Sequence, residues 1–309
     1  MSKLCYYGRK MKMDWEIYAF LLIPLVYIII FKYIPMAGIQ IAFKKYNPVK
    51  GIWGSPWVGL YHFRKFFKSY YCERVIVNTL RISIYALVAG FPIPIIFALM
   101  LNAMPGRKFK KTVQTVTYMP HFISTVVLVG MIQQLFSPSV GLYYYAYKFL
   151  GGESMPKDLL ASPNSFLHLY VWSGIWQSFG WSSIIYMAAL AGISQDLHEA
   201  AEIDGATRFQ RILHVDFPGI LPTATIMLIL RFGNIMGVGY EKIYLMQNTM
   251  NLRVSEVIST YVYKIGLGSG GNSDYSLSTA VGLFNSVVNL IMITLCNQVT
   301  RRLSETSLW

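Results

Sequence analysis

Apolar residues gather in six long runs along this chain, separated by shorter polar segments. Each run approaches the roughly 20 residues that an α-helix needs to cross a bilayer. Backbone groups in lipid must be bonded within the segment, so helices are expected, and no series of short alternating strands suggests a barrel. The pattern predicts an all-α integral membrane protein with six transmembrane helices, at residues 15–37, 75–101, 112–136, 165–192, 219–236 and 277–300.

The composition of the 309 residues agrees with this class. Only 13% of the residues are charged, about half of what a soluble domain carries, and the mean hydropathy is +0.43. The net charge of +13 is scattered over many short loops, which suits membrane topology and anionic lipid and argues against nucleic acid as a partner. The three cysteines, Cys5, Cys72 and Cys296, are far apart and predict neither a disulfide framework nor a metal site.

The orientation in the membrane is only weakly marked. The basic N-terminus leads into an apolar run without a small-residue cleavage site, so residues 15–37 are predicted to be an uncleaved first span. Equal numbers of Lys and Arg fall on the two sides, but the inner segments are shorter, and their higher charge density favours cytoplasmic termini. The basic loop at 38–74 points the other way. We expect a cytoplasmic segment at 1–14, a membrane domain at 15–300 and a cytoplasmic tail at 301–309.

Two of the predicted outer loops contain patterns typical of short helices or membrane-surface segments, and one predicted span contains prolines. Residues 61–67 (YHFRKFF) mix aromatic and basic side chains and are predicted to lie along the membrane surface. Residues 254–265 have apolar positions at helical spacing, which predicts a short outer helix. Pro92 and Pro94 are expected to kink the second span.

A charged, helix-shaped segment, QDLHEAAEIDGATRFQRILHVDFPGILPT, links the fourth and fifth spans. Asp196 followed by Glu199 is a capping-box pattern and predicts a helix beginning at Leu197. Leu197, Ala200 and Ala201 then share one face of that helix.

A second short helix is predicted after the break at Gly205. Asp204 is expected to cap it, and Phe209 lies on its apolar face. Pro218 and Pro222 are expected to end this helix and begin the fifth span. Small residues and an acidic rim suit docking to a positively charged partner surface. An ordinary solvated connector is the alternative that this pattern leaves open.

The same segment resembles the EAA loop of permease subunits of type I ATP-binding-cassette (ABC) importers. The family pattern is matched at Glu199, Ala200, Ala201, Gly205 and Pro218. Val215 and Phe217 stand where the pattern has Ile and Leu, and both remain apolar. Further stretches, including AFKKYNPVKGIWGSPWVGLYHFRKFF, VISTYVYKIGL and RRLSETSLW, are similar to the oligosaccharide and polysaccharide (LplB-like) branch of sugar permeases.

This resemblance implies an architecture and a set of partners. It implies six spans with a cytoplasmic coupling helix in the loop at 193–218, a bacterial plasma-membrane location, and an oligosaccharide substrate. It implies a second permease subunit, two cytoplasmic ATPase subunits and an extracellular solute-binding lipoprotein. ATP and Mg would be used by the ATPase, and the chain itself contains no GxxxxGK[ST] phosphate loop. The coupling residues implied are Asp196, Glu199, Ala200, Ala201, Asp204, Gly205 and Phe209.

Polar and aromatic side chains within the spans are candidates for the sugar path. Polar groups are costly in lipid, and sugars are commonly held by aromatic faces, amides and hydroxyls. The aromatic side chains also fit an interfacial belt, and the polar ones also fit glue between helices. The candidates are Gln133, Trp172, Trp176, Gln177, Trp181, Arg231, Asn234, Asn285 and Asn289.

Two other classes of membrane protein are alternatives to the importer. A self-contained secondary transporter for a small polar solute predicts inverted repeats and acidic residues within spans, but only Glu16 lies near a span. A membrane-embedded enzyme predicts a metal or nucleophile motif, and the five histidines show no HExxH spacing. The sequence therefore predicts a permease subunit that is not itself an enzyme.

Overall fold

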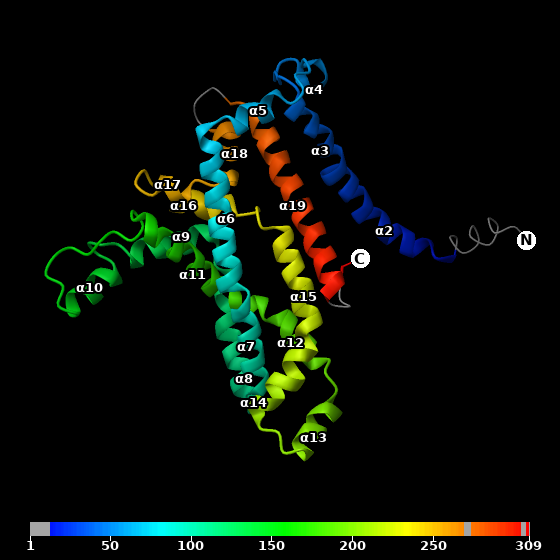
Figure 1. Ribbon diagram of the computed structural model, residues 1–309, viewed down its shortest axis with the longest axis vertical. Helices are drawn as coiled ribbons and strands as arrows, with labels where there is room; N and C mark the ends of the chain where they lie inside the picture. The colour runs from blue at the N-terminus through cyan, green and yellow to red at the C-terminus, as the bar shows by residue number, and fades with distance from the viewer. Residues whose placement is uncertain (1–12, 269–272, 304–306, 309) are drawn as a thin grey trace, which may run out of the picture.

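The computed structural model describes residues 13–268, 273–303 and 307–308, and the fold is helical (Figure 1). Within these ranges the only β-type pairing is an isolated bridge between Lys44 and Trp57. The expected segment at 1–14 lies mostly outside the described residues, as does Cys5, and of the expected tail at 301–309 the structure describes residues 301–303 and 307–308. Membrane-length helices form a tall, splayed assembly whose two ends carry short helices.

Four helical stretches of the described chain are long and apolar enough to cross a membrane. They lie at Trp15–Phe43, Tyr70–Ala103, Arg208–Gly233 and Tyr275–Arg302. The first consists of α2 (Trp15–Ile28), the π-helix η1 (Ile29–Tyr33), α3 (Ile34–Met36) and the 3-10 helix η2 (Ala37–Phe43). The second consists of α6 (Tyr70–Gly90) and α7 (Pro92–Ala103), and the last is α19 (Tyr275–Leu303). The break at Phe91, with Pro92 in the first turn of α7, is where the sequence predicted a kink.

The predicted third span is not one straight helix. It consists of α8 (Arg107–Tyr118), η3 (Met119–Phe122) and α9 (Thr125–Leu135), with a bend of 97°. Pro120 begins η3, and Ser124 caps α9 by accepting a hydrogen bond from the Val127 amide. A proline turn followed by a fresh N-cap starts a new helix rather than continuing the old one.

The predicted fourth span is helical but less apolar than the others. α11 (Pro163–Ser182) and α12 (Ile184–Ala191) cover it, but it is not among the membrane-length apolar stretches. Side chains such as Ser173, Gln177 and Ser178 lower its hydropathy. The described chain therefore has four spans by length and composition, or five with the bent pair, and the predicted six are not confirmed.

The fifth span begins earlier than predicted. α14 (Arg208–Arg211) continues through the π-helix η4 (Ile212–Asp216) into α15 (Phe217–Gly233). The expectation that Pro218 and Pro222 separate a short helix from the span was wrong. The wider π turn absorbs the missing Pro218 amide, and Pro222 lies inside α15.

Short helices cover one end of the molecule (Figure 1). They are α4 (Gly51–Gly54), α5 (Tyr61–Phe67), α16 (Tyr240–Met246), α17 (Leu252–Ser255) and α18 (Ile258–Leu267). α5 matches the predicted stretch, whereas the single helix predicted at 254–265 is divided at Glu256 and Val257. α10 (Leu142–Phe149) projects to one side, and α13 (Gln195–Ile203) lies at the far end from α4 and α5 (Figure 1).

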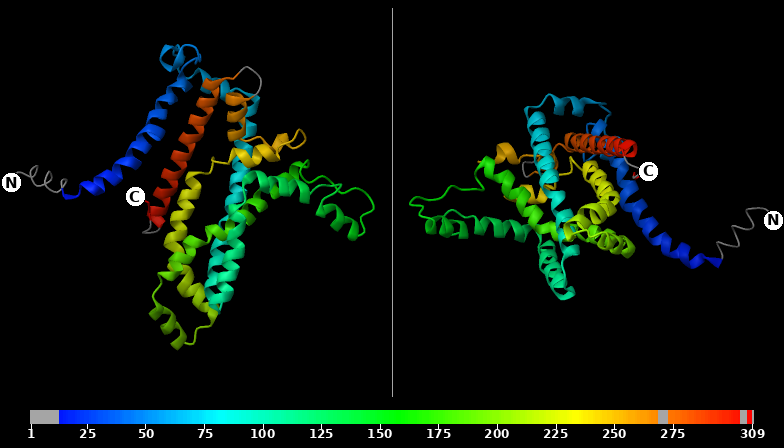
Figure 2. Two further views of the ribbon diagram at one scale, coloured as in Figure 1. Left: turned by 180° about the vertical axis from the view of Figure 1, so that it is seen from behind. Right: turned by 60° about the horizontal axis from the view of Figure 1, so that its bottom comes forward.

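Three apolar clusters hold the helices together. The first joins α5, α6, α18 and α19 around Phe66 and Val281, and the second joins α6, α9 and α11 around Phe166. The third joins α7, α12 and α15 around Tyr186 and Ile220. α2 takes no part, because none of the most apolar window of Trp15–Phe43 is buried, and this helix diverges from the bundle (Figure 2).

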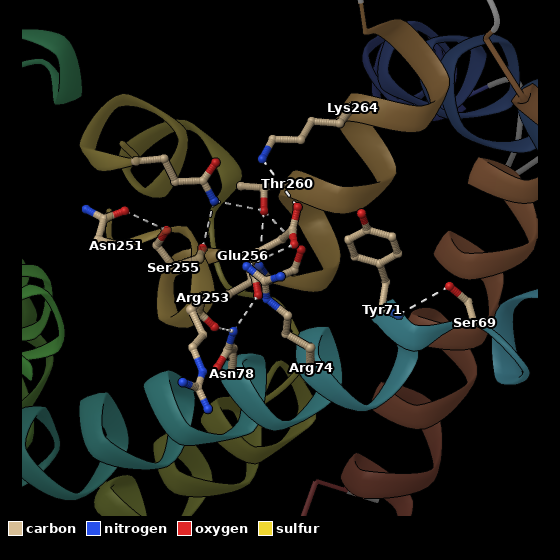
Figure 3. Close-up of polar contacts among 12 residues, drawn as sticks. Ser69, Tyr71, Arg74, Asn78, Asn251, Arg253, Ser255, Glu256, Thr260 and Lys264 are labelled. Atoms are coloured by element: carbon tan, nitrogen blue, oxygen red, sulfur yellow. Dashed lines mark hydrogen bonds and ion pairs between the residues drawn. The ribbon is translucent and has the colours of Figure 1, made fainter. Parts of the chain in front are cut away.

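A polar junction fastens α17 and α18 to α6 (Figure 3). Asn78 donates hydrogen bonds to the Arg253 and Glu256 carbonyls, both at 2.9 Å. The Glu256 carboxylate is buried, with Arg74 at 3.6 Å and Lys264 at 3.4 Å. This junction sets the position of the segment that returns from α15 toward α19.

Candidate functional site

The charged loop folds as a helix, a glycine turn and a second helix. Ser194, not Asp196, caps α13, accepting a hydrogen bond from the Asp196 amide at 3.2 Å. The predicted capping box at Asp196 and Glu199 was therefore wrong by two residues. A serine or threonine two residues upstream competes for the cap position whenever its backbone is extended, as that of Ser194 is.

Gly205 closes α13 in a left-handed conformation with φ of +77°. The Ala206 amide donates to the Ala201 carbonyl at 2.9 Å, and the Gly205 amide donates to the Glu202 carbonyl at 3.0 Å. This pair of bonds is a Schellman motif, which favours glycine. Asp204 is the last residue of this helix end and does not cap the next helix, contrary to prediction.

The second helix of the loop has its own cap. Thr207 accepts from the Gln210 amide, and Gln210 Oε1 accepts from the Thr207 amide at 2.7 Å. This capping box begins α14 directly at the foot of the fifth span. The loop is therefore a rigid element rather than an open connector.

One face of α13 is fastened to the bundle and the other faces outward. His198 Nε2 lies 3.5 Å from the buried Asp216 carboxylate, which also accepts from Asn102 at 3.3 Å. Glu202 forms an ion pair with Arg211. A polar cavity of about 460 Å³ lies between α13 and the foot of the span.

Exposed apolar side chains mark the outward surface of the loop. Leu197 is 56% exposed, Ile203 87% and Phe209 71%. Glu199 and Ala200 are exposed beside them, while Ala201 is half-buried. An apolar surface with an acidic rim at the tip of a capped helix is suited to docking another protein.

The sugar-path candidates do not form one cluster. Arg231 and Asn234 line a cavity of about 350 Å³ between α6, α11 and α15. Arg231 also lines a second cavity of about 270 Å³, together with Gln177 and Lys242. Tyr170 lines both cavities, so they share a wall.

The remaining candidates lie elsewhere. Trp172 donates from Nε1 to the Tyr85 hydroxyl at 2.9 Å and, with Trp176, lines an apolar cavity against α9. Trp181 stacks on His121 at 4.6 Å between ring centroids. Gln133 donates to the Leu245 carbonyl at 3.3 Å.

The two asparagines of α19 differ in their surroundings. Asn289 Oδ1 accepts from the Met236 amide at 3.0 Å, a contact that ties α19 to the chain after α15. Asn285 Oδ1 is buried and has no hydrogen-bond partner among the described residues. The first fits a structural role, so its place in a sugar path remains only a prediction.

Lys242 is a cavity residue that the sequence did not single out. It lies in α16, within a segment predicted to be an outer loop, yet its Nζ donates to the Tyr170 carbonyl at 3.0 Å. The Nζ also lies 4.9 Å from the centre of the Tyr170 ring. Burial lowers the pKa of Lys242 to about 8. Its position after an apolar span, in GVGYEKIYLM, is the only local sign of this role.

Within the described ranges, no three His, Cys, Asp or Glu residues are grouped to hold a metal. The candidate sites are thus a docking loop at one end and cavities between helices. The sequence profile of the family "Binding-protein-dependent transport system inner membrane component" matches residues 90–305. This chain belongs to that family.

Relatives and solved structures match nearly the whole permease. It is 39% identical to protein LplB of Bacillus subtilis (strain 168), covering 97% of this chain and 92% of the relative. It is also 39% identical to the polygalacturonan/rhamnogalacturonan transport system permease protein YteP of the same organism, covering 95% and 90%. A bacterial alginate ABC transporter, crystallised with an alginate pentasaccharide-bound periplasmic protein, contains a chain that superposes with a TM-score of 0.87. That chain is 38% identical, with coverage of 97% and 99%.

These similarities settle the class of protein. The chain is a multi-pass membrane permease subunit of an ABC importer, with the all-α fold of that family. It is a permease and not itself an enzyme, and the alternative of a self-contained secondary transporter is wrong. The profile match spans both the docking loop and Arg231, while Trp15–Phe43 lies outside it.

Proposed function

We propose that this permease forms, with a second permease subunit, the path for an oligosaccharide in the plasma membrane of a bacterium. An extracellular binding lipoprotein delivers the sugar, and two cytoplasmic ATPase subunits use ATP and Mg to drive import. The observation that carries the proposal is the match over nearly the full length to permeases and to a structure whose names specify polysaccharides.

The outward surface of α13 is the proposed contact with an ATPase subunit. Glu199 and Ala200 are exposed there, Phe209 is exposed on the following helix α14, and Gly205 gives the turn between the two helices its shape. The contacts of His198 and Glu202 with the span give a route by which movement of the ATPase reaches α15.

α2 is the proposed contact with the second permease. A helix with 45–79% exposure at Phe20, Ile23 and Leu25 needs an apolar neighbour, which can be lipid or protein. Since its companion helices pack through three shared clusters, a free membrane-length helix is most simply explained by a second permease beside it.

The proposed orientation places α13 and both termini in the cytoplasm. The outer surface then carries α4 and α5, at the opposite end (Figure 1). Cysteine labelling with an impermeant maleimide tests this orientation: Ala200→Cys should react in inverted vesicles and not in intact cells.

Purification of tagged protein from native membranes in mild detergent, with mass spectrometry, tests the assembly. We expect a second permease and an ATPase, with the ATPase lost in Ala200→Trp and kept in Ala146→Trp. Both alanines are exposed, but Ala146 lies in α10, away from α13 (Figure 1). Recovery of the chain alone, still moving solute without ATP after reconstitution, would contradict the proposal.

A further inference from the structure

The two cavities next to Tyr170 are lined by an unusual pair of cationic side chains. Arg231 borders both cavities from α15, and Lys242 borders the second from α16. Neither lining includes an Asp or a Glu. A cavity between membrane helices that presents positive charge without negative charge is electrostatically prepared for an anion.

Neither cation has an acidic partner. Among the residues that the structure describes, no carboxylate lies within 4.0 Å of the Arg231 guanidinium or the Lys242 ammonium. By contrast, the buried Glu256 has two basic partners. Lys242 is partly buried and Arg231 is exposed at the cavity wall. A cation held at such a wall without a carboxylate partner is available to bind an anion, which marks these two side chains as functional candidates.

The groups around the cations define the kind of anion. Asn234 and Ser83 face the first cavity, and Gln177 and Ser178 face the second, so hydrogen-bonding groups surround the positive charges. Amides and hydroxyls match the hydroxyls of a sugar ring. The planar Arg231 guanidinium matches a carboxylate, which it can bind through two parallel hydrogen bonds.

The surroundings of the Lys242 ammonium also leave it able to contact a ligand in the cavity. Gly174 lies against Lys242, and a Cβ added there would lie 3.2 Å from Nζ. The absence of a side chain at Gly174 therefore makes room for the ammonium at the cavity wall. Among the described residues, the one hydrogen-bond acceptor of the Lys242 ammonium is the Tyr170 carbonyl, and a primary ammonium can donate three bonds. Two donor positions therefore remain for a ligand.

We infer that Arg231 and Lys242 bind the carboxylates of an acidic oligosaccharide, one built from uronic acid residues, as it passes through this permease. The inference rests on the proposed function and narrows its substrate class. Because these positive charges lie in the permease, the permease itself favours acidic sugars, in addition to the selectivity of the external binding protein.

Direct binding to the purified complete transporter, without its binding protein, tests the inference. Trigalacturonate is compared with its trimethyl ester, which has the same length and no charge, at low and high salt. We expect trigalacturonate to bind at least about tenfold more tightly at low salt, and the preference to shrink as salt rises. Arg231→Gln and Lys242→Gln should each lower trigalacturonate affinity by about tenfold and leave the ester unchanged.

Arg253→Gln is the matched control, because Arg253 is exposed in α17 and lines neither cavity. It should bind like the unchanged protein. ATP hydrolysis and co-purification of the partners verify that each variant is folded and assembled. Equal affinity for the acid and the ester, in a transporter that still assembles and hydrolyses ATP, overturns the inference and leaves the proposed function standing. A chain that brings no ATPase with it overturns both.

Discussion

His198 and Asp216 join α13 to the base of the fifth span. Nε2 of His198 lies 3.5 Å from Oδ1 of Asp216, and the carboxylate is buried beneath it. His198 belongs to α13 and Asp216 to the π turn that leads into α15. Under the proposed docking role, a displacement of α13 would reach α15 through this polar contact as well as through the backbone.

Breaking this contact should weaken both stability and coupling. His198→Ala leaves the buried Asp216 with Asn102 as its remaining side-chain partner, and we expect about 1 kcal/mol lower free energy of unfolding. The ATPase should still co-purify, because the outward surface is intact, but ATP-driven uptake should fall. The measurement is uptake per ATP hydrolysed in reconstituted vesicles.

A double variant measures the interaction energy between His198 and Asp216 apart from the contacts that each side chain makes with other residues. If the contact is real, His198→Ala should cost little further stability in an Asp216→Asn background. Additive losses would show that the two side chains act independently.

Glycine is required at position 205 because of its backbone conformation, and not because a side chain there would collide with the rest of the chain. Nothing lies within 4 Å of an added Cβ, but its φ of +77° strains any residue with a side chain. Gly205→Ala should cost about 1–2 kcal/mol, and Gly205→Asn less, since Asn tolerates this region. Gly130→Ala is the control, because it also has open space and no positive φ. Thermal unfolding in detergent measures the three. Loss of ATPase binding in Gly205→Asn without loss of stability would show that the partner approaches closely here.

The Glu256 carboxylate should be critical for the stability of α17 and α18 (Figure 3). Glu256→Ala leaves Arg74 and Lys264 without their carboxylate in a largely buried setting, and we expect a loss of about 2–3 kcal/mol. Lys264 is the more exposed partner, so Lys264→Ala should cost less than Arg74→Ala. Hydrogen exchange of α17 and α18 measures the effect. Unchanged protection in Glu256→Ala would refute the junction as their anchor.

Binding of an acidic sugar should depend on pH through Lys242. Burial lowers the pKa of this side chain to about 8, so its charge is present below that pH and lost above it. Trigalacturonate affinity should therefore fall as pH rises from 7 to 9, and the neutral ester should not respond. The unfolded lysine holds its proton up to its ordinary pKa of 10.5, so this group adds folding stability as pH rises from about 8 toward 10.5. Lys242→Arg should retain affinity at pH 9, and a pH profile shared with Lys242→Gln would contradict the assignment.

The length of the apolar runs was enough to predict the class, because every span must stay apolar across the thickness of the lipid. It was not enough for the third and fourth spans. The Pro120 turn and the Ser124 cap bend the third by 97°, and an apolar average over the window hides such a turn. The fourth is helical but too polar for the same test, because its side chains face cavities as well as apolar neighbours.

Local rules predicted the coupling loop in outline and missed its caps. The break between the two helices is at Gly205 as predicted, because local sequence alone determines this turn. The choice between Ser194 and Asp196 as cap depends on backbone angles that sequence does not reveal. Lys242 was missed for a different reason: its contact with Tyr170 spans 72 residues of sequence. Pairings across such separations need the folded bundle.

Photo-crosslinking from α13 tests the central claim most directly. A photoreactive residue replacing Glu199 in the assembled transporter should attach to the ATPase subunit, and the yield should change on ATP binding. The same residue at Tyr145, exposed in α10, should not reach the ATPase. Attachment from Tyr145 and none from Glu199 would contradict the account, because the ATPase would then dock away from the coupling helix.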